Sequence, residues 1–479
     1  MKRRNNSFLR SWRVAFACPK TCRLVIVVPL SGGRVNIYEG EWMGAVYSAQ
    51  TLAAGALAQV QLIEKEQGIG LAAADRLRVL VLASDADMPR EFWGNPESLI
   101  FSERSAEFVV DSWRVHVKGA SGWGWQGEAL DDFVRGYLAT DRAINQIGGF
   151  GLLASPALTG AYLAESLLPC SEVETPPADF LAELSRSTQN RVEYFFPFVS
   201  RSLYEYDQRF AYAAHAAREL PGNLAYRVKA NHFIPYEPGF YVARVTVPQG
   251  WNHVGLLPFY SEGQPATWPT SGEFVTFAAE PEIRLALAHG WDVQIQHGWR
   301  FEKARPLENW KRKLCAARQL QLERGQSQID GMISARQLKA ILHQAIGKFY
   351  ARGYTRERVV SESQFLDLDV LDFVREGKKL RIQERVENDG RHYMPHVAAY
   401  IWALSRTATL AKALTIPKPL LAGFNADAVY SAVETAWGDT GSPGQFVLKS
   451  SRVLPRNCQG AVLNSISDVR NFLKGGEYA

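Results

Sequence analysis

The sequence predicts a mixed α+β fold, and three observations support that class. The chain has 479 residues, of which 47% are hydrophobic and 22% charged, a composition typical of a soluble globular protein large enough for two or three domains. Residues 1–185 alternate short β-rich runs with helical stretches. From Tyr194 onward, strands and helices follow one another in a different order, so we expect a second domain there.

The N-terminal 185 residues carry the strands and helices of an α/β or α+β domain. Aliphatic and β-branched residues dominate four runs that we interpret as strands: RLVIVV, RVNIYEG, LRVLVLA and FVVDSWRVHV. Helices are expected around 46–66 and 128–147. The polar, proline-rich segment 169–180 is interpreted as the linker to the next domain.

Beyond the linker, strands and helices are again expected. The run SLYEYD predicts a strand that leads into the alanine-rich helix AYAAHAAREL, which Pro221 and Gly222 are expected to end. Two helices are expected at 306–324 and 333–350, and the charged segment 354–394 looks like an exposed hairpin. Further strands are expected in GFYVARVTV, GEFVTFA and DVQIQHGWRF, helices in PEIRLALAHG and VAAYIWALSRTATLAKAL, and a strand-turn-strand unit in LAGFNADAVYSAV.

Positive charge is concentrated in one segment. Residues 301–352 contain eleven Lys and Arg against four Asp and Glu, whereas the net charge of the whole chain is only +5. Such a cationic element in a nearly neutral protein indicates a polyanion as partner, with nucleic acid or a nucleotide phosphate as the first candidate. A solvated helix face is the alternative interpretation.

Nothing in the sequence points to a membrane or to an oxidising compartment. The densest apolar stretch, Leu24–Val28, ends at Pro29 and is far shorter than the roughly 18 residues of a membrane span. Five scattered cysteines are too few for a disulfide framework, and no apolar signal region follows the basic N-terminus. We therefore expect a cytoplasmic protein with no membrane partner.

Two aspartates occupy similar places in distant parts of the sequence. Asp207 and Asp427 each lie at or beside the end of an apolar run. Two carboxylates that converge from neighbouring strands suit two divalent cations, which activate an attacking hydroxyl and neutralise the leaving group of a phosphoryl transfer. Aspartates at strand ends are also common turn and cap residues, so both interpretations stay open at this point.

Three segments together resemble the family B DNA polymerases. DQRFAYA at 207–213 is similar to motif A of that family, KAILHQAIGKF at 339–349 to motif B, and FNADAV at 424–429 to motif C. The segments between the motifs are similar to the protein-primed branch, so the resemblance covers roughly residues 186–450. It implies a right-hand polymerase fold with an antiparallel palm sheet, helical fingers and a reduced thumb.

The resemblance also implies roles for individual residues. Asp207 and Asp427 correspond to the catalytic metal ligands, with two Mg²⁺ or Mn²⁺ ions as cofactors, and Tyr212 corresponds to the aromatic residue that excludes ribonucleotides. The residues implied for nucleotide binding are Tyr212, Arg336, Lys339, His343 and Gly347, and those expected to contact DNA are Lys311, Arg312, Lys313, Lys348 and Lys449.

The motifs depart from the family pattern at several positions, which keeps a second hypothesis open. Phe210 and Ala213 replace a serine and a proline of motif A. Asn425 replaces the first aspartate of motif C, and His343 replaces an asparagine of motif B. The first hypothesis is a DNA polymerase, and the alternative is a catalytically impaired palm-fold protein that binds DNA or scaffolds a replication or defence complex.

The N-terminal domain occupies the position of the family's RNase H-like proofreading exonuclease. That activity requires four acidic metal ligands beginning on the first strand, whereas the run RLVIVVPL contains no acidic residue. Asp111 and Asp141 are the remaining candidates, and Asp141 is similar to the third exonuclease motif. We therefore expect a vestigial domain without 3′–5′ exonuclease activity; a nuclease that uses these acids is a third hypothesis.

Domain boundaries and partners follow from the same resemblance. We expect template and primer DNA and deoxynucleoside triphosphates as partners, with a priming protein as a further one, in the replication of a phage, plasmid or mobile element. The expected domains are an exonuclease-like domain at 1–185, palm at 186–300 with an insertion at 230–270, fingers at 301–352, a palm insertion at 353–394, palm at 395–450 and a reduced thumb at 451–479.

Overall fold

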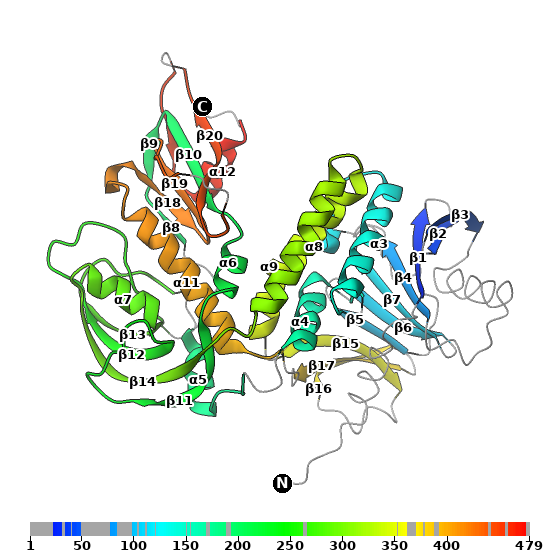
Figure 1. Cartoon of the computed structure of the whole chain (residues 1–479), viewed down its shortest axis with the longest axis horizontal. Helices are drawn as coiled ribbons and strands as arrows, with labels where there is room; N and C mark the ends of the chain where they lie inside the picture. Colours follow the sequence, from blue (N-terminus) through cyan, green and yellow to red (C-terminus); the bar gives the residue numbers. More distant parts are fainter. Residues whose placement is uncertain are drawn as a thin grey trace, which may run out of the picture. The chain divides into compact units, whose positions relative to one another are not determined.

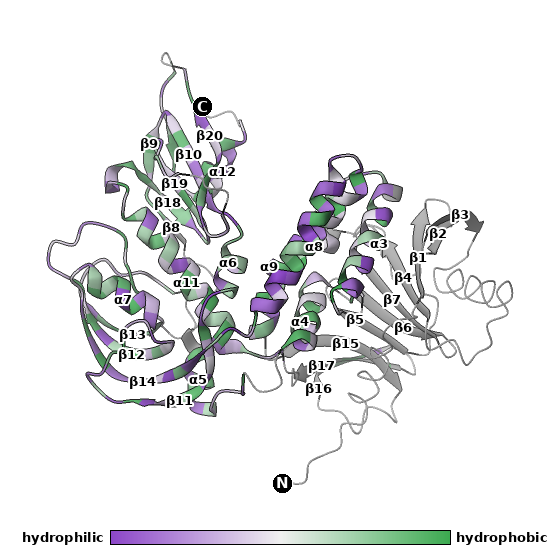
Figure 2. Cartoon of the chain, viewed as in Figure 1, coloured by the Kyte–Doolittle hydropathy of each residue, from purple (hydrophilic) through white to green (hydrophobic). Residues whose placement is uncertain are grey.

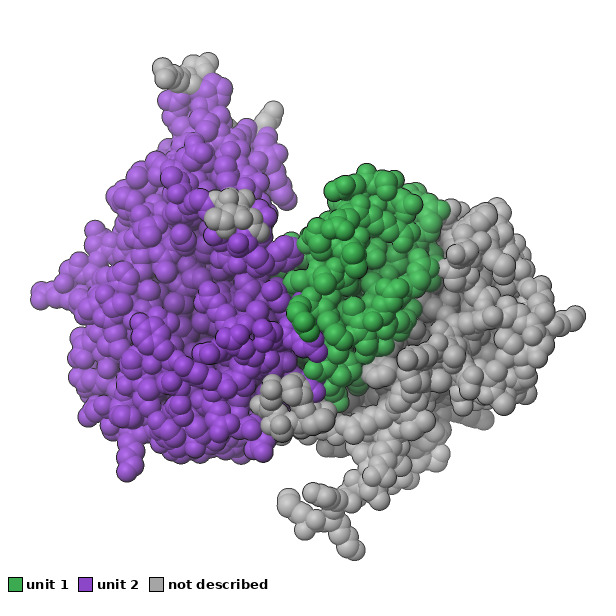
Figure 3. Space-filling model, in the orientation of Figure 1, with its two compact units in different colours: residues 1–167, 312–392 green, residues 168–311, 393–479 purple. Residues whose placement is uncertain are grey.

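The computed structural model divides the chain into two compact units (Figure 3). Unit 1 consists of Met1–Leu167 and Arg312–His392, and unit 2 of Leu168–Lys311 and Tyr393–Ala479. The structure describes the strands between residues 23 and 119 and residues 121–475, apart from 150, 154, 169–172, 188–192, 262–265, 352, 362–369, 377–378, 388–391, 439–441 and 456–457.

The strands of unit 1 form one mixed sheet (Figure 1). β1 lies between β2 and β4 and runs parallel to β4, which in turn runs parallel to β7. Three of the four runs predicted as strands each form one strand, whereas FVVDSWRVHV covers the end of β6 and most of β7. The helix expected around 46–66 lies largely outside the described residues. The bounds are β1 Arg23–Leu30, β2 Arg34–Glu39, β3 Glu41–Ser48, β4 Leu77–Ala83, β5 Ser98–Ser102, β6 Ser105–Val110 and β7 Trp113–Gly119.

Three further strands extend this sheet from a distant part of the sequence. β15 (Gly353–Ser361) pairs with β5, and β17 (Lys379–Glu387) pairs with both β15 and β16 (Val370–Glu376), all antiparallel. Glu376 pairs with Lys379, so β16 and β17 form the hairpin predicted in the charged segment. This hairpin belongs to the sheet of unit 1.

Helix α9 (Ile329–Tyr350) packs against α3 (Leu130–Gln146) and α4 (Pro156–Leu167) in unit 1. A Cβ on Gly160 of α4 would lie 2.6 Å from the Cβ of Ala345, which is closer than real Cβ atoms approach. The missing side chain is therefore what allows α4 and α9 to lie so close together.

The two helices predicted at 306–324 and 333–350 are α8 (Glu308–Gly325) and α9. Hydrophilic residues recur along both of them (Figure 2). They carry most of the positive charge that the sequence concentrates in 301–352.

Unit 2 contains an antiparallel sheet of five strands in the order β20-β10-β19-β18-β8. Helix α11 packs against β18 and β19, and α12 packs against β20 and the short strand β21, which pairs with β9. The bounds are β8 Glu193–Phe195, β9 Phe198–Ser200, β10 Ser202–Gln208, β18 Leu421–Asn425, β19 Ala428–Ser431, β20 Phe446–Val453, β21 Ala461–Leu463, α11 Pro395–Ala413 and α12 Ile466–Leu473.

The second sheet of unit 2 has four antiparallel strands in the order β11-β14-β12-β13. β12 is an inner strand, although it falls within 230–270, where an insertion was expected. The bounds are α5 Ala178–Ser187, β11 Leu220–Val228, β12 Gly239–Thr246, β13 Glu273–Ala279, α7 Glu280–Ala288 and β14 Asp292–Ala304.

The alanine-rich helix is shorter than the sequence predicted. Helix α6 begins at Ala211 and ends at Ala216, and β11 begins at Leu220 and includes Pro221. Proline fits there because β11 is an edge strand of its sheet, where one face of the backbone needs no partner strand. Pairing with β14 therefore overrides the local helix preference of this segment.

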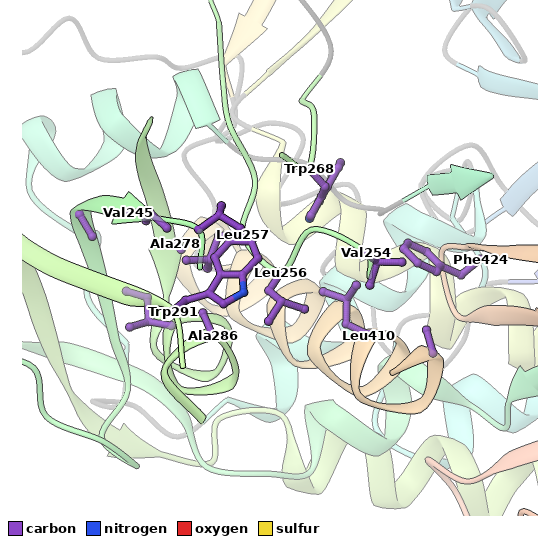
Figure 4. Close-up of a cluster of buried hydrophobic side chains, with 14 of the residues drawn as sticks. Val245, Val254, Leu256, Leu257, Trp268, Ala278, Ala286, Trp291, Leu410 and Phe424 are labelled. Carbon is purple, nitrogen blue, oxygen red and sulfur yellow. The ribbon is translucent and has the colours of Figure 1, made fainter. Parts of the chain in front are cut away.

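The main core of unit 2 connects its two sheets through α11. Val245 of β12 and Trp291, which directly precedes β14, belong to the four-stranded sheet and its connections. They pack in one cluster with Leu410 of α11 and Phe424 of the five-stranded sheet (Figure 4). Full burial of a side chain such as Leu410 or Phe424 stabilises the fold by roughly 1.5–3 kcal/mol. The cluster therefore holds the five-stranded sheet, which carries Asp207 and Asp427, on a rigid support.

Candidate functional site

Asp207 and Asp427 lie at adjacent strand ends of the five-stranded sheet. Asp207 of β10 pairs with Ala428, the first residue of β19, and Asp427 immediately precedes Ala428. The backbone N–H of Gln208 donates to the carbonyl oxygen of Asp427 over 2.9 Å. Strand pairing thus brings together two residues that are far apart in the sequence.

Strained backbone conformations flank both aspartates. Phe210, three residues after Asp207, has a φ of 51°, and Ala426, directly before Asp427, has a φ of 55°. The left-handed region costs a non-glycine residue roughly 1 kcal/mol or more. The hydroxyl of Thr409 on α11 donates to the carbonyl oxygen of Ala426 over 3.1 Å and holds this turn. Strain that the surrounding structure maintains in this way is common at functional sites.

Lys449 forms ion pairs with Asp207 and with Glu205. Its Nζ lies 3.2 Å from Oδ2 of Asp207 and 3.3 Å from Oε1 of Glu205. Burial alone would lower the pKa of Lys449, but the negative charges of Asp207 and Glu205 outweigh it and raise that pKa. The sequence placed Lys449 among the DNA contacts and did not mark Glu205 at all.

A β-bulge positions Lys449. The register of β10 against β20 shifts between Glu205 and Tyr206, and Lys449 is the additional residue on β20 at this point. Glu205 and Asp207 are two positions apart on β10 and therefore share one face of the sheet. Because the register of a bulge depends on the partner strand, the sequence of β20 by itself does not reveal it.

Tyr212 lies on α6, the short helix that follows Asp207, and its side chain is half-buried. Gln208 anchors the start of this segment, because its Nε2 lies 3.3 Å from Nε2 of His215 and donates to the carbonyl oxygen of Gly444 over 2.9 Å. Burial, together with the charge of Arg218, lowers the pKa of His215 to about 3, so its ring is neutral at neutral pH.

The second group of candidate residues lies on α8 and α9. Lys339 and His343 are one turn apart on α9. Burial, and to a smaller extent the positive charges of Lys339 and of Arg318 from α8, together lower the pKa of His343 to about 4. The sequence analysis missed Arg318 because no motif marks it; the charge excess of 301–352 was the only signal for it.

Gly347 is an exposed glycine that the fold itself does not require. A Cβ at this position would meet no atom within 4 Å, and its backbone φ lies outside the left-handed region. The surface of α9 is therefore open at Gly347.

Two of the expected phosphate-binding cations have partners inside unit 1. Arg336 forms an ion pair with Glu128 and donates from Nη1 to Oε1 of Gln126 over 2.9 Å. Lys313 donates from Nζ to the carbonyl oxygen of Ile147 over 3.0 Å, at the C-terminus of α3. The sequence does not indicate these contacts because the partners lie 166 to 210 positions away.

The other basic residues predicted to bind DNA have mixed surroundings. Arg312 is exposed, Lys311 is half-buried, and burial lowers the pKa of Lys348 on α9. Lys311 belongs to unit 2, whereas Arg312 and Lys348 belong to unit 1.

Asp141, one of the two expected exonuclease remnants, has a structural role. It is buried on α3, where Oδ1 accepts a hydrogen bond from the backbone N–H of Leu152 over 2.7 Å and Oδ2 accepts one from Nδ2 of Asn145 over 3.1 Å. Asp111 lies outside the described residues.

Across the described residues, no group of three or more His, Cys, Asp or Glu side chains is arranged to hold a metal ion. In the same part of the chain, none of the helices has the length and apolar character needed to cross a bilayer.

The chain has a mixed α+β fold, with Asp207 and Asp427 at adjacent strand ends in unit 2 and the basic helix α9 in unit 1. Solved structures of phi29 DNA polymerase, a protein-primed family B polymerase, have a similar fold. The expected resemblance to this branch is therefore confirmed for the fold.

Three of these structures illustrate the extent of the likeness. An orthorhombic crystal form of phi29 DNA polymerase matches with a TM-score of 0.58 and 10% sequence identity, over 90% of this chain and 85% of that chain. The ternary complex with primer-template DNA and incoming nucleotides matches with a TM-score of 0.58, 9% identity and coverage of 92% and 86%. The post-translocation binary complex with primer-template DNA matches with a TM-score of 0.56 and 9% sequence identity, over 92% of this chain and 86% of that chain. No protein-family model and no curated protein sequence matches the chain.

Proposed function

We propose that this chain is a template-directed DNA polymerase that transfers deoxynucleotides to a primer hydroxyl. The observation that carries the proposal is the placement of Asp207 beside Asp427 in an antiparallel sheet, within a fold similar to that of a DNA polymerase. Primer-template DNA and nucleotides, which the neighbouring complexes contain, are then the partners of this chain.

Asp207 and Asp427 would hold the divalent cations, Mg²⁺ or Mn²⁺. The donor set fits a hard cation because both ligands are carboxylates, and Mg²⁺ commonly takes only one or two of them and completes its shell with water and substrate phosphates. The ammonium of Lys449 lies 3.2 Å from Asp207, so a positive charge is favourable at this position. When bound, the two ions would supply charge stabilisation for the in-line transfer of the α-phosphoryl group.

The residues of α8 and α9 would bind the incoming triphosphate. Lys339 and Arg318 supply permanent positive charge, and neutral His343 supplies one N–H donor beside them. Such groups stabilise the charge that develops on the phosphates during transfer. The open surface at Gly347 leaves room for the nascent base pair, and Tyr212 would contact the sugar and exclude a 2′-hydroxyl.

Lys311, Arg312 and Lys348 remain proposed contacts to the DNA backbone, where basic side chains bind without sequence preference. Arg336 forms an ion pair with Glu128, and Lys313 donates a hydrogen bond to the carbonyl oxygen of Ile147. A priming protein remains a proposed partner, with segments 230–270 and 353–394 as its proposed binding regions.

Unit 1 is proposed to contain a remnant of a proofreading exonuclease. The strand order β3-β2-β1-β4-β7, with parallel pairing of β1 with β4 and of β4 with β7, supports the RNase H-like assignment. β1 has no acidic residue, and the carboxylate of Asp141 is occupied by a backbone and an amide hydrogen bond. Both observations favour a domain without nuclease activity.

The alternative function is a palm-fold protein that binds DNA without polymerising it. It is favoured by Asn425 at the position of a family aspartate and by the ion pair that neutralises Asp207. A scaffold of this kind needs no metal at Asp427, whereas a polymerase does.

Primer extension on a primed template, with Mg²⁺ and Mn²⁺ tested separately, distinguishes the two functions. We expect the wild type to extend the primer and Asp427→Asn to reduce the rate by at least a hundredfold, because one metal ligand is lost. Asp292→Asn is the matched control, since Asp292 is an exposed aspartate of the same unit. DNA binding with no extension by the wild type in either metal would favour the scaffold.

A further inference from the structure

We propose that Lys449 is an internal counter-cation of the metal site. Its ammonium neutralises Asp207 while no metal ion is bound, and Glu205 retains it when a metal ion takes Asp207. The inference rests on the proposed function, because it requires Asp207 to be a metal ligand. It assigns Glu205 and Lys449 as positioning residues that act through Asp207.

The geometry gives the lysine two alternative partners at almost equal distance. Nζ of Lys449 is 3.2 Å from Asp207 and 3.3 Å from Glu205. The side chain of Lys449 is 54% exposed and that of Asp207 31%, whereas that of Glu205 is only 14% exposed. Lys449 therefore has room to shift between them, and Glu205 is the more enclosed of the two partners.

Glu205 is also the carboxylate that the fold holds in place. Its Oε2 accepts a hydrogen bond from the hydroxyl of Ser450 over 2.6 Å, the residue next to Lys449 on β20. This contact leaves Oε1 directed at the ammonium. Glu205 can thus keep Lys449 without any change in the backbone.

Electrostatics determines the order of events. Glu205 and Asp207 share a sheet face, and without Lys449 their negative charges would repel one another. A divalent cation that arrives at Asp207 repels the ammonium, which then keeps only its contact to Glu205. Because the cation must displace Lys449, its affinity for the free protein is lowered, and nucleotide phosphates must supply the remaining attraction.

Direct binding of Mn²⁺ to the full-length protein, measured by electron paramagnetic resonance at low ionic strength without DNA or nucleotide, tests the proposal. We expect Lys449→Met to tighten Mn²⁺ binding roughly three- to tenfold, the range expected when a partly exposed competing ion pair is removed. Lys449→Arg keeps the charge and should bind Mn²⁺ like the wild type. Equal affinity in the wild type and Lys449→Met would overturn the proposal.

Lys303→Met is the matched control. Lys303 also lies between two carboxylates, with Nζ 3.5 Å from Glu219 and 3.3 Å from Glu237. Its replacement removes the same charge from the same unit and should leave Mn²⁺ affinity unchanged. Equal tightening in this variant would mean that net charge alone is responsible, which contradicts the role of Lys449.

Glu205→Gln tests the second partner. Lys449 then has only Asp207, so Mn²⁺ binding should weaken several-fold, and the loss should be smaller in the Lys449→Met background. An equal loss in both backgrounds would overturn the role of Glu205. The proposed metal site itself fails in a different way: the wild type and every variant would bind no Mn²⁺, or Asp207→Asn would bind it unchanged.

Discussion

Lys339, His343 and Gly347 lie on three successive turns of α9, yet their surroundings differ. Lys339 and Gly347 are exposed, whereas His343 is half-buried, and it is neutral because burial and two nearby cations lower its pKa to about 4. The spacing i, i+4, i+8 indicates one helix face. It does not reveal which of these positions is covered by α8.

Lys339→Ala is expected to affect nucleotide use more than DNA binding. The lost contact is to the triphosphate, so the apparent KM for deoxynucleotides should rise and the rate should fall, by roughly tenfold each. Steady-state kinetics beside a DNA-binding titration checks this, with Lys474→Ala as an exposed control in unit 2. Loss of DNA binding with intact nucleotide kinetics would contradict the motif B assignment.

Gly347→Ala separates function from stability at one position. Because a Cβ there meets no protein atom, the variant should fold with unchanged stability or gain up to about 1 kcal/mol from the better helix propensity of alanine. If the nascent base pair lies at this surface, the apparent KM for deoxynucleotides should rise. Chemical unfolding and primer-extension kinetics measure the two effects, and unchanged kinetics would remove Gly347 from the proposed site.

At the level of secondary structure, the packing of α9 depends on the close approach of α3 and α4. Gly160 of α4 and Gly136 of α3 both leave space for α9, where a Cβ would fall 2.5 to 2.6 Å from side chains of that helix. Lys313 and Asp141 add hydrogen bonds at the end of α3 and in the segment after it. The helices that carry Lys339 are therefore held by packing that has no direct role in chemistry.

Gly160→Ala is expected to destabilise unit 1, in contrast to Gly347→Ala. The added methyl group would clash with Ala345 and with the carbonyl oxygen of Ile341, and overpacking of this kind costs about 1–3 kcal/mol. Urea unfolding of both alanine variants measures the difference. The prediction is wrong if the two variants unfold at the same denaturant concentration.

In the molecule as a whole, each unit carries its own group of candidate residues. Unit 2 holds Asp207, Asp427 and Lys449, and unit 1 holds Lys339 and His343. Unit 2 also contains two fully buried histidines, His215 and His396, and burial is the main cause that lowers the pKa of each to about 3. These histidines make the stability of the protein sensitive to acid.

The protein is expected to lose stability as the pH falls below about 6.5, the ordinary pKa of histidine. Both folded pKa values are lower than this, so the unfolded chain binds more protons in that range. Stability is complete above pH 6.5 and declines toward pH 3, by about 1 kcal/mol per pH unit for each histidine. Urea unfolding at pH 7.5 and pH 5 measures the loss.

His215→Gln should reduce this pH dependence by the share of one histidine, because glutamine does not titrate. His289→Gln, which replaces an exposed histidine of the same unit, should leave it unchanged. An identical pH dependence in His215→Gln and the wild type would contradict the assignment.

Much of the fold was predictable because it depends on local patterns. The runs of β-branched residues in 23–119 became strands, and the segments 333–350 and VAAYIWALSRTATLAKAL became parts of α9 and α11. The helix predicted at 211–220 forms but ends at Ala216, and pairing of β11 with β14, a long-range interaction, outweighs helix propensity from Leu220 onward. The hairpin at 370–387 was recognised, but its place in the sheet of unit 1 was not.

The sequence alone was enough to propose the candidate residues, with Asp207 and Asp427 at strand ends and Lys339 on a helix, and to predict the resemblance to a polymerase that the fold confirmed. The pairs of charges that come into contact depend on the three-dimensional fold. It pairs Lys449 with Asp207 and Glu205, and it gives Arg336 and Lys313 partners inside unit 1. The physical reason is that the attraction between charges depends on their separation in space, and in a folded chain that separation is set by strand register and helix packing.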